Sequence, residues 1–109
     1  MPNNIDNDYL WFKEELQNSK KEYLEEIENY SENLKKNNEN LERINNLITL
    51  IVPTQNIPLQ KILFRSLENL KNDIEFNMQE FALLQEKLNN INEAITITNS
   101  DILLQTYNI

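Results

Sequence analysis

The side chains that most often perform catalysis or hold transition metals are missing from this chain. Its 109 residues include no His and no Cys, so it has no imidazole base, no thiol nucleophile and no thiolate ligand. It also has no Gly, which removes the Gly-rich loops that bind phosphate groups. The remaining acids, hydroxyls and lysines show no catalytic spacing. We therefore expect a protein that is not an enzyme and that has no catalytic residues, no cofactor and no bound metal.

One group of carboxylates has a spacing that could hold a hard cation weakly. Glu22 lies within about one helical turn of Glu25 and Glu26, but no calcium-loop pattern accompanies them. The same residues belong to a wider acidic face, which consists of Glu22, Glu25, Glu26, Glu28 and Glu32. Lysines flank this face, which is typical of an ordinary solvated helix surface. The alternative is an acidic surface that mimics nucleic acid and blocks a partner enzyme.

The net charge of −8 argues against direct nucleic-acid binding, which needs basic residues to neutralise phosphate. Residues 1–12 lack the basic stretch and apolar run of a secretory signal, and no apolar run is long enough to span a membrane. We therefore expect a cytoplasmic protein without a membrane partner. The abundance of Asn, Ile, Lys and Glu suits an AT-rich genome, such as that of a low-GC bacterium or of a phage in its host cell.

A heptad pattern in both halves of the chain predicts two long helices that pack along a narrow seam. In the first half the d positions are Tyr9, Leu16, Tyr23, Tyr30, Asn37, Ile44 and Ile51, and the a positions are Lys13, Lys20, Ile27, Leu34, Leu41 and Ile48. In the second half the a positions are Leu67, Ile74, Phe81, Leu88, Ile95 and Ile102, and the d positions are Leu63, Leu70, Asn77, Leu84, Ile91 and Thr98. This pattern specifies a shape and a partner helix but no chemistry.

Prolines and periodicity set the expected bounds of the elements. Residues 1–7 lack periodicity and are expected to form a disordered tail. The first helix should cover about 8–52, because Pro53 cannot continue a helix. Residues 53–57 form a loop, and the second helix covers about 58–98, since Pro58 suits a first helical turn. Residues 8–109 should therefore form one all-α domain, an antiparallel helical hairpin of the coiled-coil type.

The C-terminal segment, residues 99–109, has two interpretations. The β-branched residues at 95–98 have poor helix propensity, which favours a helix end near Thr98. A short helix from Ile102 to Tyr107 would then follow. Because Ile102 keeps the heptad phase, an unbroken second helix is the alternative.

Each half of the seam contains one asparagine. In an antiparallel pair each a residue faces a d residue of the other helix, so alignment about the proline loop places Asn37 and Asn77 in neighbouring layers. Their amides could therefore reach each other. Polar seam residues usually fix register and oligomeric state, and we assign Asn37 and Asn77 that structural role.

Apolar residues left over after the seam is filled are concentrated in the second half of the chain. Its c positions predict a second stripe, to which Phe64 and Met78 at e positions add. The c residues of this stripe are Ile62, Phe76, Leu83, Ile97 and Leu104. A stripe of this size usually marks an interface, although a folded-back C-terminal segment could cover it instead. If the second helices of two copies of the chain packed against each other across a twofold axis, the dimer would be a four-helix bundle.

The consecutive residues Leu10, Trp11 and Phe12 cannot all face one seam, because successive helical residues point about 100° apart. We favour an end-cap core in which Leu103, Leu104 and Tyr107 cover them. Trp and Phe are also frequent binding anchors, so Trp11 and Phe12 are alternative partner contacts.

These patterns favour a non-enzymatic protein-protein interaction module that self-associates or binds helical partners, as a chaperone, adaptor or assembly subunit does. The alternative is a small acidic inhibitor, encoded by a phage or bacterium, that blocks a nucleic-acid-processing or immune enzyme by surface mimicry. The two hypotheses differ in chemistry. Apolar contacts survive high salt, whereas contacts made by exposed carboxylates weaken with salt.

Overall fold

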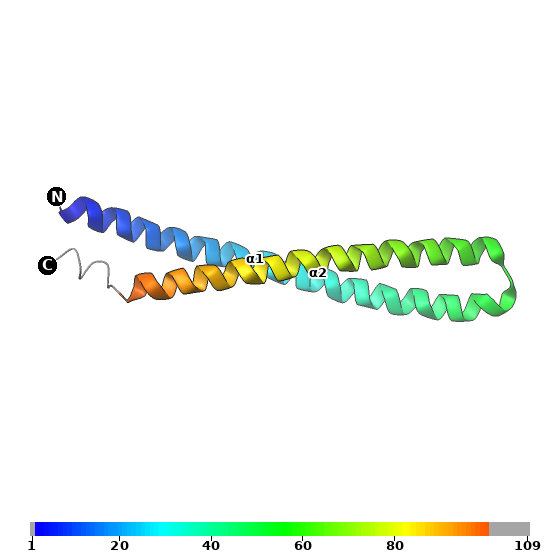
Figure 1. Ribbon diagram of the computed structural model, residues 1–109. Helices are drawn as coiled ribbons and strands as arrows, with labels where there is room; N and C mark the ends of the chain where they lie inside the picture. The colour runs from blue at the N-terminus through cyan, green and yellow to red at the C-terminus, as the bar shows by residue number, and fades with distance from the viewer. Residues whose placement is uncertain (1, 101–109) are drawn as a thin grey trace. The chain divides into compact units, whose positions relative to one another are not determined.

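The chain folds as a helical hairpin. The computed structural model describes residues 2–100, with side chains from Asp6 onwards. It contains helix α1 (Pro2–Ile51), a short 3-10 helix η1 (Val52–Thr54) and helix α2 (Ile57–Asn99) (Figure 1). These residues include no strand. The predicted all-α helical hairpin is therefore confirmed.

The heptad pattern correctly identifies the residues that α1 turns toward α2. Every a and d residue of α1 from Tyr9 to Ile51 is buried or half-buried. Among the other described side chains of α1, only Ser19 is not exposed. The a residues Lys13 and Lys20 are half-buried, and the Lys13 Nζ atom lies 5.2 Å from the centre of the Tyr9 ring. A cation above the ring in this way is attracted by the negative face of the ring.

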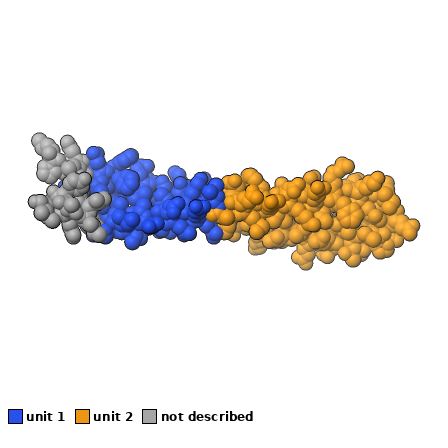
Figure 2. All heavy atoms as spheres, in the orientation of Figure 1, with its two compact units in different colours: residues 1–27, 83–109 blue, residues 28–82 orange. Residues whose placement is uncertain are grey.

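The residues form two compact units, which Figure 2 distinguishes by colour. Unit 1 comprises Met1–Ile27 and Leu83–Ile109, and unit 2 comprises Glu28–Ala82. Each unit therefore contains a segment of α1 packed on a segment of α2, and the turn belongs to unit 2. Each unit has its own core.

Among the described side chains of unit 1, three hydrophobic residues are buried: Leu16, Leu84 and Ile95. Leu84 has the lowest exposure of these, 5%. A hydrogen bond joins the two helix segments, because the Tyr9 hydroxyl donates to the backbone carbonyl of Thr98 at 2.6 Å. The seam partner predicted for Tyr9, Ile102, lies outside the described residues.

The core of unit 2 is smaller, with Leu63 and Leu70 as its only buried hydrophobic residues among those described. Both lie on the first third of α2. The Asn37 Nδ2 atom is buried and has no hydrogen-bond partner. The expectation that Asn37 and Asn77 could reach each other is therefore wrong for this donor. At this layer of the seam between the two helix segments, the Asn37 amide occupies a d position that a hydrocarbon side chain usually fills.

The turn of unit 2 is closed without glycine. Gln55 occupies the left-handed region, with φ 59° and ψ 23°, and is the only residue with positive φ between residues 2 and 100. The Asn56 Oδ1 atom accepts a hydrogen bond from the Leu59 amide at 3.3 Å, which satisfies a donor in the first turn of α2. The predicted loop at 53–57 is close to the observed connection, since η1 covers Val52–Thr54 and α2 begins at Ile57.

The helix bounds differ from the expected ones mainly at the N-terminus. The structure has α1 beginning at Pro2, whereas residues 1–7 were expected to lie outside the helix. Pro2 needs no amide hydrogen in a first turn, and a formed helix extends with one hydrogen bond per added residue, so absent periodicity does not end it. At the other end α2 stops at Asn99, one residue past the expected end at Thr98. Residues 101–109, including the predicted segment Ile102–Tyr107, lie outside the described residues.

Candidate interaction surfaces

The predicted acidic face consists of separate, exposed carboxylates. Glu22, Glu25 and Glu26 are exposed in unit 1, and Glu28 and Glu32 are exposed in unit 2. In the part of the chain that the structure describes, no three Asp or Glu residues come together as a metal site requires. The acidic face can therefore act on a partner only as solvated surface charge.

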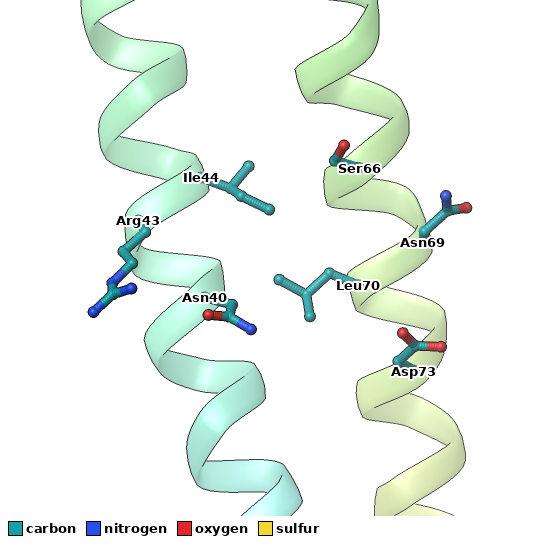
Figure 3. Close-up of a pocket in the computed structure, with 7 residues that line it drawn as sticks. All are labelled: Asn40, Arg43, Ile44, Ser66, Asn69, Leu70 and Asp73. Carbon is teal, nitrogen blue, oxygen red and sulfur yellow. The ribbon is translucent and has the colours of Figure 1, made fainter.

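A groove in unit 2 lies between the two helix segments and has a volume of about 420 Å³ (Figure 3). Ile44 and Leu70 project between the helices, while Arg43 projects away from α2. The other lining residues are polar: Asn40, Ser66, Asn69 and Asp73. The groove is open, and hydrocarbon side chains of the core lie at its base. It holds no pair of groups arranged for acid-base chemistry.

The predicted apolar residues of α2 in unit 2 are all exposed. Phe76, for example, is 57% exposed. They do not form one stripe, because residues two positions apart on a helix point about 200° apart. Ile62 and Phe76 at c positions lie on one side of the seam, and Phe64 and Met78 at e positions lie on the other. The prediction that the e residues reinforce the c stripe is therefore wrong.

The c face of α2 in unit 2 is continuous with the groove. Ser66, Asn69 and Asp73 follow Ile62 at spacings of four, seven and eleven residues, which places them on one face of the helix. Phe76 follows at the far end of that face. The face therefore has an exposed apolar residue at each end and polar groove residues between them.

In unit 1 the same c positions of α2 carry Leu83 and Ile97, which are also exposed. Leu104, the last residue of the predicted stripe, lies outside the described residues. Each unit therefore has its own pair of exposed c residues. By contrast, the c positions of α1 are polar from Asp8 to Arg43.

The aromatic residues near the start of α1 are exposed in unit 1. Trp11 is 60% exposed, and Leu10 and Phe12 are also exposed. The end-cap core that was expected to cover them requires Leu103, Leu104 and Tyr107. Those three residues lie outside the described part of the chain, so this prediction stays open.

Sequence reasoning missed a set of exposed apolar residues around the turn. They are Leu47, Leu50, Val52 and Ile57. The signal that could have found them is the lack of charge, since no residue between Arg43 and Lys61 is charged. A chain in which 26% of residues are charged would place about four charges in such a stretch.

No family model, no characterised protein and no solved structure matches this chain. None of the helices formed by residues 2–100 is long and apolar enough to cross a membrane. Its surfaces therefore have to be interpreted from their own chemistry.

Proposed function

We propose that this protein is a non-enzymatic interaction module that self-associates through the outer face of α2. Two hairpins would form a four-helix bundle of the kind used by chaperones, adaptors and assembly subunits. The observation that carries the proposal is the exposure of all four described apolar c residues of α2, whereas the c positions of α1 are polar from Asp8 to Arg43. Those four residues are Ile62, Phe76, Leu83 and Ile97.

The small core supports association. Among residues 6–100, no side chain is fully buried, and only five hydrophobic residues are buried. The chain exposes 8527 Å², about a third more than the roughly 6,300 Å² expected for a folded monomer of 13.0 kDa. A second hairpin would reduce this surface and thicken the core of both copies.

The expected gain is moderate. Burying a fully exposed Phe, Leu or Ile contributes about 1.5–3 kcal/mol. The four c residues are already about half-covered, so each contributes about 1 kcal/mol. In a twofold dimer each of these residues is buried once in each copy. The summed free energy of burial therefore offsets part of the cost of association.

The test is the absolute solution mass by light scattering after size exclusion, at low salt and at about 0.5 M salt. Because apolar contacts are insensitive to salt, we expect about twice the monomer mass in both conditions. Phe76→Asp or Leu83→Asp should give the monomer mass, since each places a carboxylate in the apolar contact. Leu24→Asp is the matched control, because Leu24 is an exposed leucine on α1, and this variant should remain a dimer. A monomeric unmodified protein would contradict the proposal.

The rival function is an acidic inhibitor that blocks a nucleic-acid-processing or immune enzyme. The exposure of the five glutamates on α1 supports it. A complex of this kind should weaken steeply as salt rises from low concentration to about 0.5 M. Reversing the charge of Glu22, Glu25 and Glu26 together to Lys should abolish it, while Phe76→Asp should leave it intact. The two functions are therefore separable with the same set of proteins.

A further inference from the structure

The turn of the hairpin is surrounded by exposed apolar side chains. We call residues 44–60 the hairpin tip. Leu50 is 70% exposed, more than any other large hydrophobic residue among those described. Other exposed hydrophobic residues in or beside the tip are Leu47, Val52, Ile57, Ile62 and Phe64. The tip itself has no charged residue, so it presents only hydrocarbon and uncharged polar groups.

These apolar residues occupy both flanks of the tip. Leu47, Leu50 and Ile62 hold g and c positions, on one side of the seam. Val52, Ile57 and Phe64 hold e positions, on the other side. A partner helix packed alongside would cover only one flank. Both flanks are covered together only if the tip inserts end-on into an apolar environment.

Several polar groups of the turn are paired with each other. The Thr54 hydroxyl donates to the Ile51 carbonyl at 2.6 Å, and the Gln55 amide donates to the Val52 carbonyl at 3.3 Å. The Gln60 side-chain amide donates to the same carbonyl at 3.3 Å. Together with the Asn56 cap, these bonds lower the cost of moving the turn out of water, because unpaired backbone groups are costly in an apolar medium.

A ring of positive charge lies just behind the tip. Residues 43–67 contain Arg43, Lys61 and Arg65 but none of the 18 acidic residues of the chain. All three basic side chains are exposed, and none forms an ion pair within the described residues. Arg43 lies eight residues before the end of α1, and Arg65 lies eight residues after the start of α2. At 1.5 Å per residue, both are about 12 Å from the turn.

We propose that the hairpin tip inserts into the headgroup region of an anionic lipid bilayer. The apolar band is about 10 Å deep from the turn to Phe64, which matches the 5–10 Å to which interfacial apolar groups enter a bilayer. Arg43 and Arg65, at equal height on two helices, would both contact the lipid phosphates, and Lys61 would extend its ammonium group to the same layer. The segment 43–67, which contains the uncharged tip and the three basic residues behind it, has a charge of +3 in a chain of net charge −8, so we expect an anionic surface to attract this segment.

A planar bilayer fits these observations better than a protein socket does. A socket would have to enclose two helices and place acidic groups at one height around both of them, whereas a bilayer has that geometry everywhere. The sequence-based expectation of no membrane partner rested on the lack of a spanning segment. An interfacial tip needs none. This site also goes beyond the proposed self-association, because Leu50, Val52 and Ile57 lie outside the c face of α2.

The experiment is flotation of the full chain with vesicles of phosphatidylcholine alone or mixed with phosphatidylserine. We expect binding to the mixed vesicles at low salt and at least tenfold weaker binding to phosphatidylcholine. Arg43→Gln combined with Arg65→Gln should weaken binding to the mixed vesicles about 30-fold, since each basic residue near an anionic surface contributes about a fivefold factor. Leu50→Asp should weaken it at least tenfold.

Two controls separate insertion from unfolding and from self-association. Leu24→Asp makes the same change at an exposed leucine in unit 1 and should bind as the unmodified chain does. Phe76→Asp should lose the dimer but keep vesicle binding. A Leu50→Trp probe in a Trp11→Phe background should show quenching of its fluorescence by brominated lipid, whereas the native Trp11 should not.

The proposal is overturned if mixed vesicles fail to float the protein or if Leu50→Asp binds them as well as Leu24→Asp does. If the unmodified chain does not bind mixed vesicles, the solution mass of Leu50→Asp identifies the alternative. A changed mass would mean that the tip is an interface between copies of the chain. Equal helicity of all variants by circular dichroism excludes loss of fold as the cause.

Discussion

The two units of this hairpin use the same heptad seam differently. Unit 1 contains ten acidic and four basic residues, a net charge of −6, whereas unit 2 contains eight acidic and six basic residues, a net charge of −2. Of the side chains that the structure describes, unit 1 buries three hydrophobic residues and Thr98, and unit 2 buries two hydrophobic residues. Unit 2 also holds the unpaired Asn37 amide and the apolar tip.

The difference separates packing from presentation. Unit 1 combines the better-filled seam with most of the negative charge. Unit 2 has the weaker seam, yet it carries the exposed apolar residues around the turn and the basic residues behind them. A protein whose partners were all recognised by acidic charge would have no reason to keep hydrocarbon at an uncharged tip. The following variants test this comparison.

The largest effect should come from truncating the most buried residue of unit 1. Leu84→Ala should lower the free energy of unfolding by about 3 kcal/mol, because it removes buried hydrocarbon and leaves a cavity. Leu70→Ala in unit 2 should cost less, about 2 kcal/mol, since Leu70 borders the open groove and water can enter the space it leaves. Urea denaturation followed by circular dichroism at fixed protein concentration measures both.

The exposed Leu24→Ala is the control for this pair and should change stability by less than about 0.5 kcal/mol. A larger loss for Leu70→Ala than for Leu84→Ala would reverse the proposed ranking of the two cores.

The second variant should make unit 2 more like unit 1. Asn37→Leu replaces a buried amide that lacks a donor partner with a hydrocarbon at a d position. We expect the free energy of unfolding to rise by about 2 kcal/mol, because the desolvation penalty of the amide is removed. A more uniform seam should also relax register and oligomeric state, which light scattering would detect as additional species.

Asn38→Leu is the matched control, because Asn38 is the exposed neighbour and gains no core contact. Equal effects of the two variants would mean that Asn37 does not limit the stability of unit 2.

The third variant tests the hydrogen bond that joins the helix segments of unit 1. Tyr9→Phe keeps the ring over Lys13 but removes the donor to the Thr98 carbonyl. The loss should be about 1 kcal/mol, as for an ordinary partly buried hydrogen bond. Relative to the unmodified chain, the variant should show a larger increase in hydrogen exchange for amides near Thr98 than for amides near Leu63. Tyr23→Phe, at a half-buried tyrosine for which no hydrogen bond is found, should change stability little.

The seam was predictable from sequence, and the surfaces were predictable only in part. A period of seven residues determines which side of each helix faces the other, so the a and d residues of α1 were identified correctly. The same period does not determine how well the side chains of each layer pack or whether their polar atoms find partners. The unpaired Asn37 amide was therefore not predicted. The e and c residues of α2 were grouped by hydrophobicity, although helical geometry places Phe64 and Ile62 on opposite flanks.

The turn shows a different limit of sequence reasoning. Prolines at 53 and 58 correctly indicated a loop, but the pattern gave no reason to place positive φ at Gln55. Where a helix end has a residue in the left-handed region, that residue is usually glycine, and this chain has no glycine. The apolar tip was also overlooked, because a heptad assignment treats residues near a turn as the ends of stripes and not as a surface of their own.

The smallest effect should come from Gln55→Gly, which tests the geometry of the turn in unit 2. A side chain with a Cβ atom is disfavoured in the left-handed region by about 1 kcal/mol, and glycine is not. Part of this gain is lost because glycine makes the unfolded chain more flexible. We therefore expect unfolding to cost about 0.5 kcal/mol more, measured as a higher urea midpoint at unchanged slope. Gln55→Ala keeps the Cβ atom and should be neutral, while Gln55→Val should destabilise by more than 1 kcal/mol, since β-branching makes positive φ costlier. A neutral Gly variant together with a tolerated Val variant would mean that residue 55 is not held at positive φ, and the pairing of turn groups on which tip insertion depends would have to differ as well.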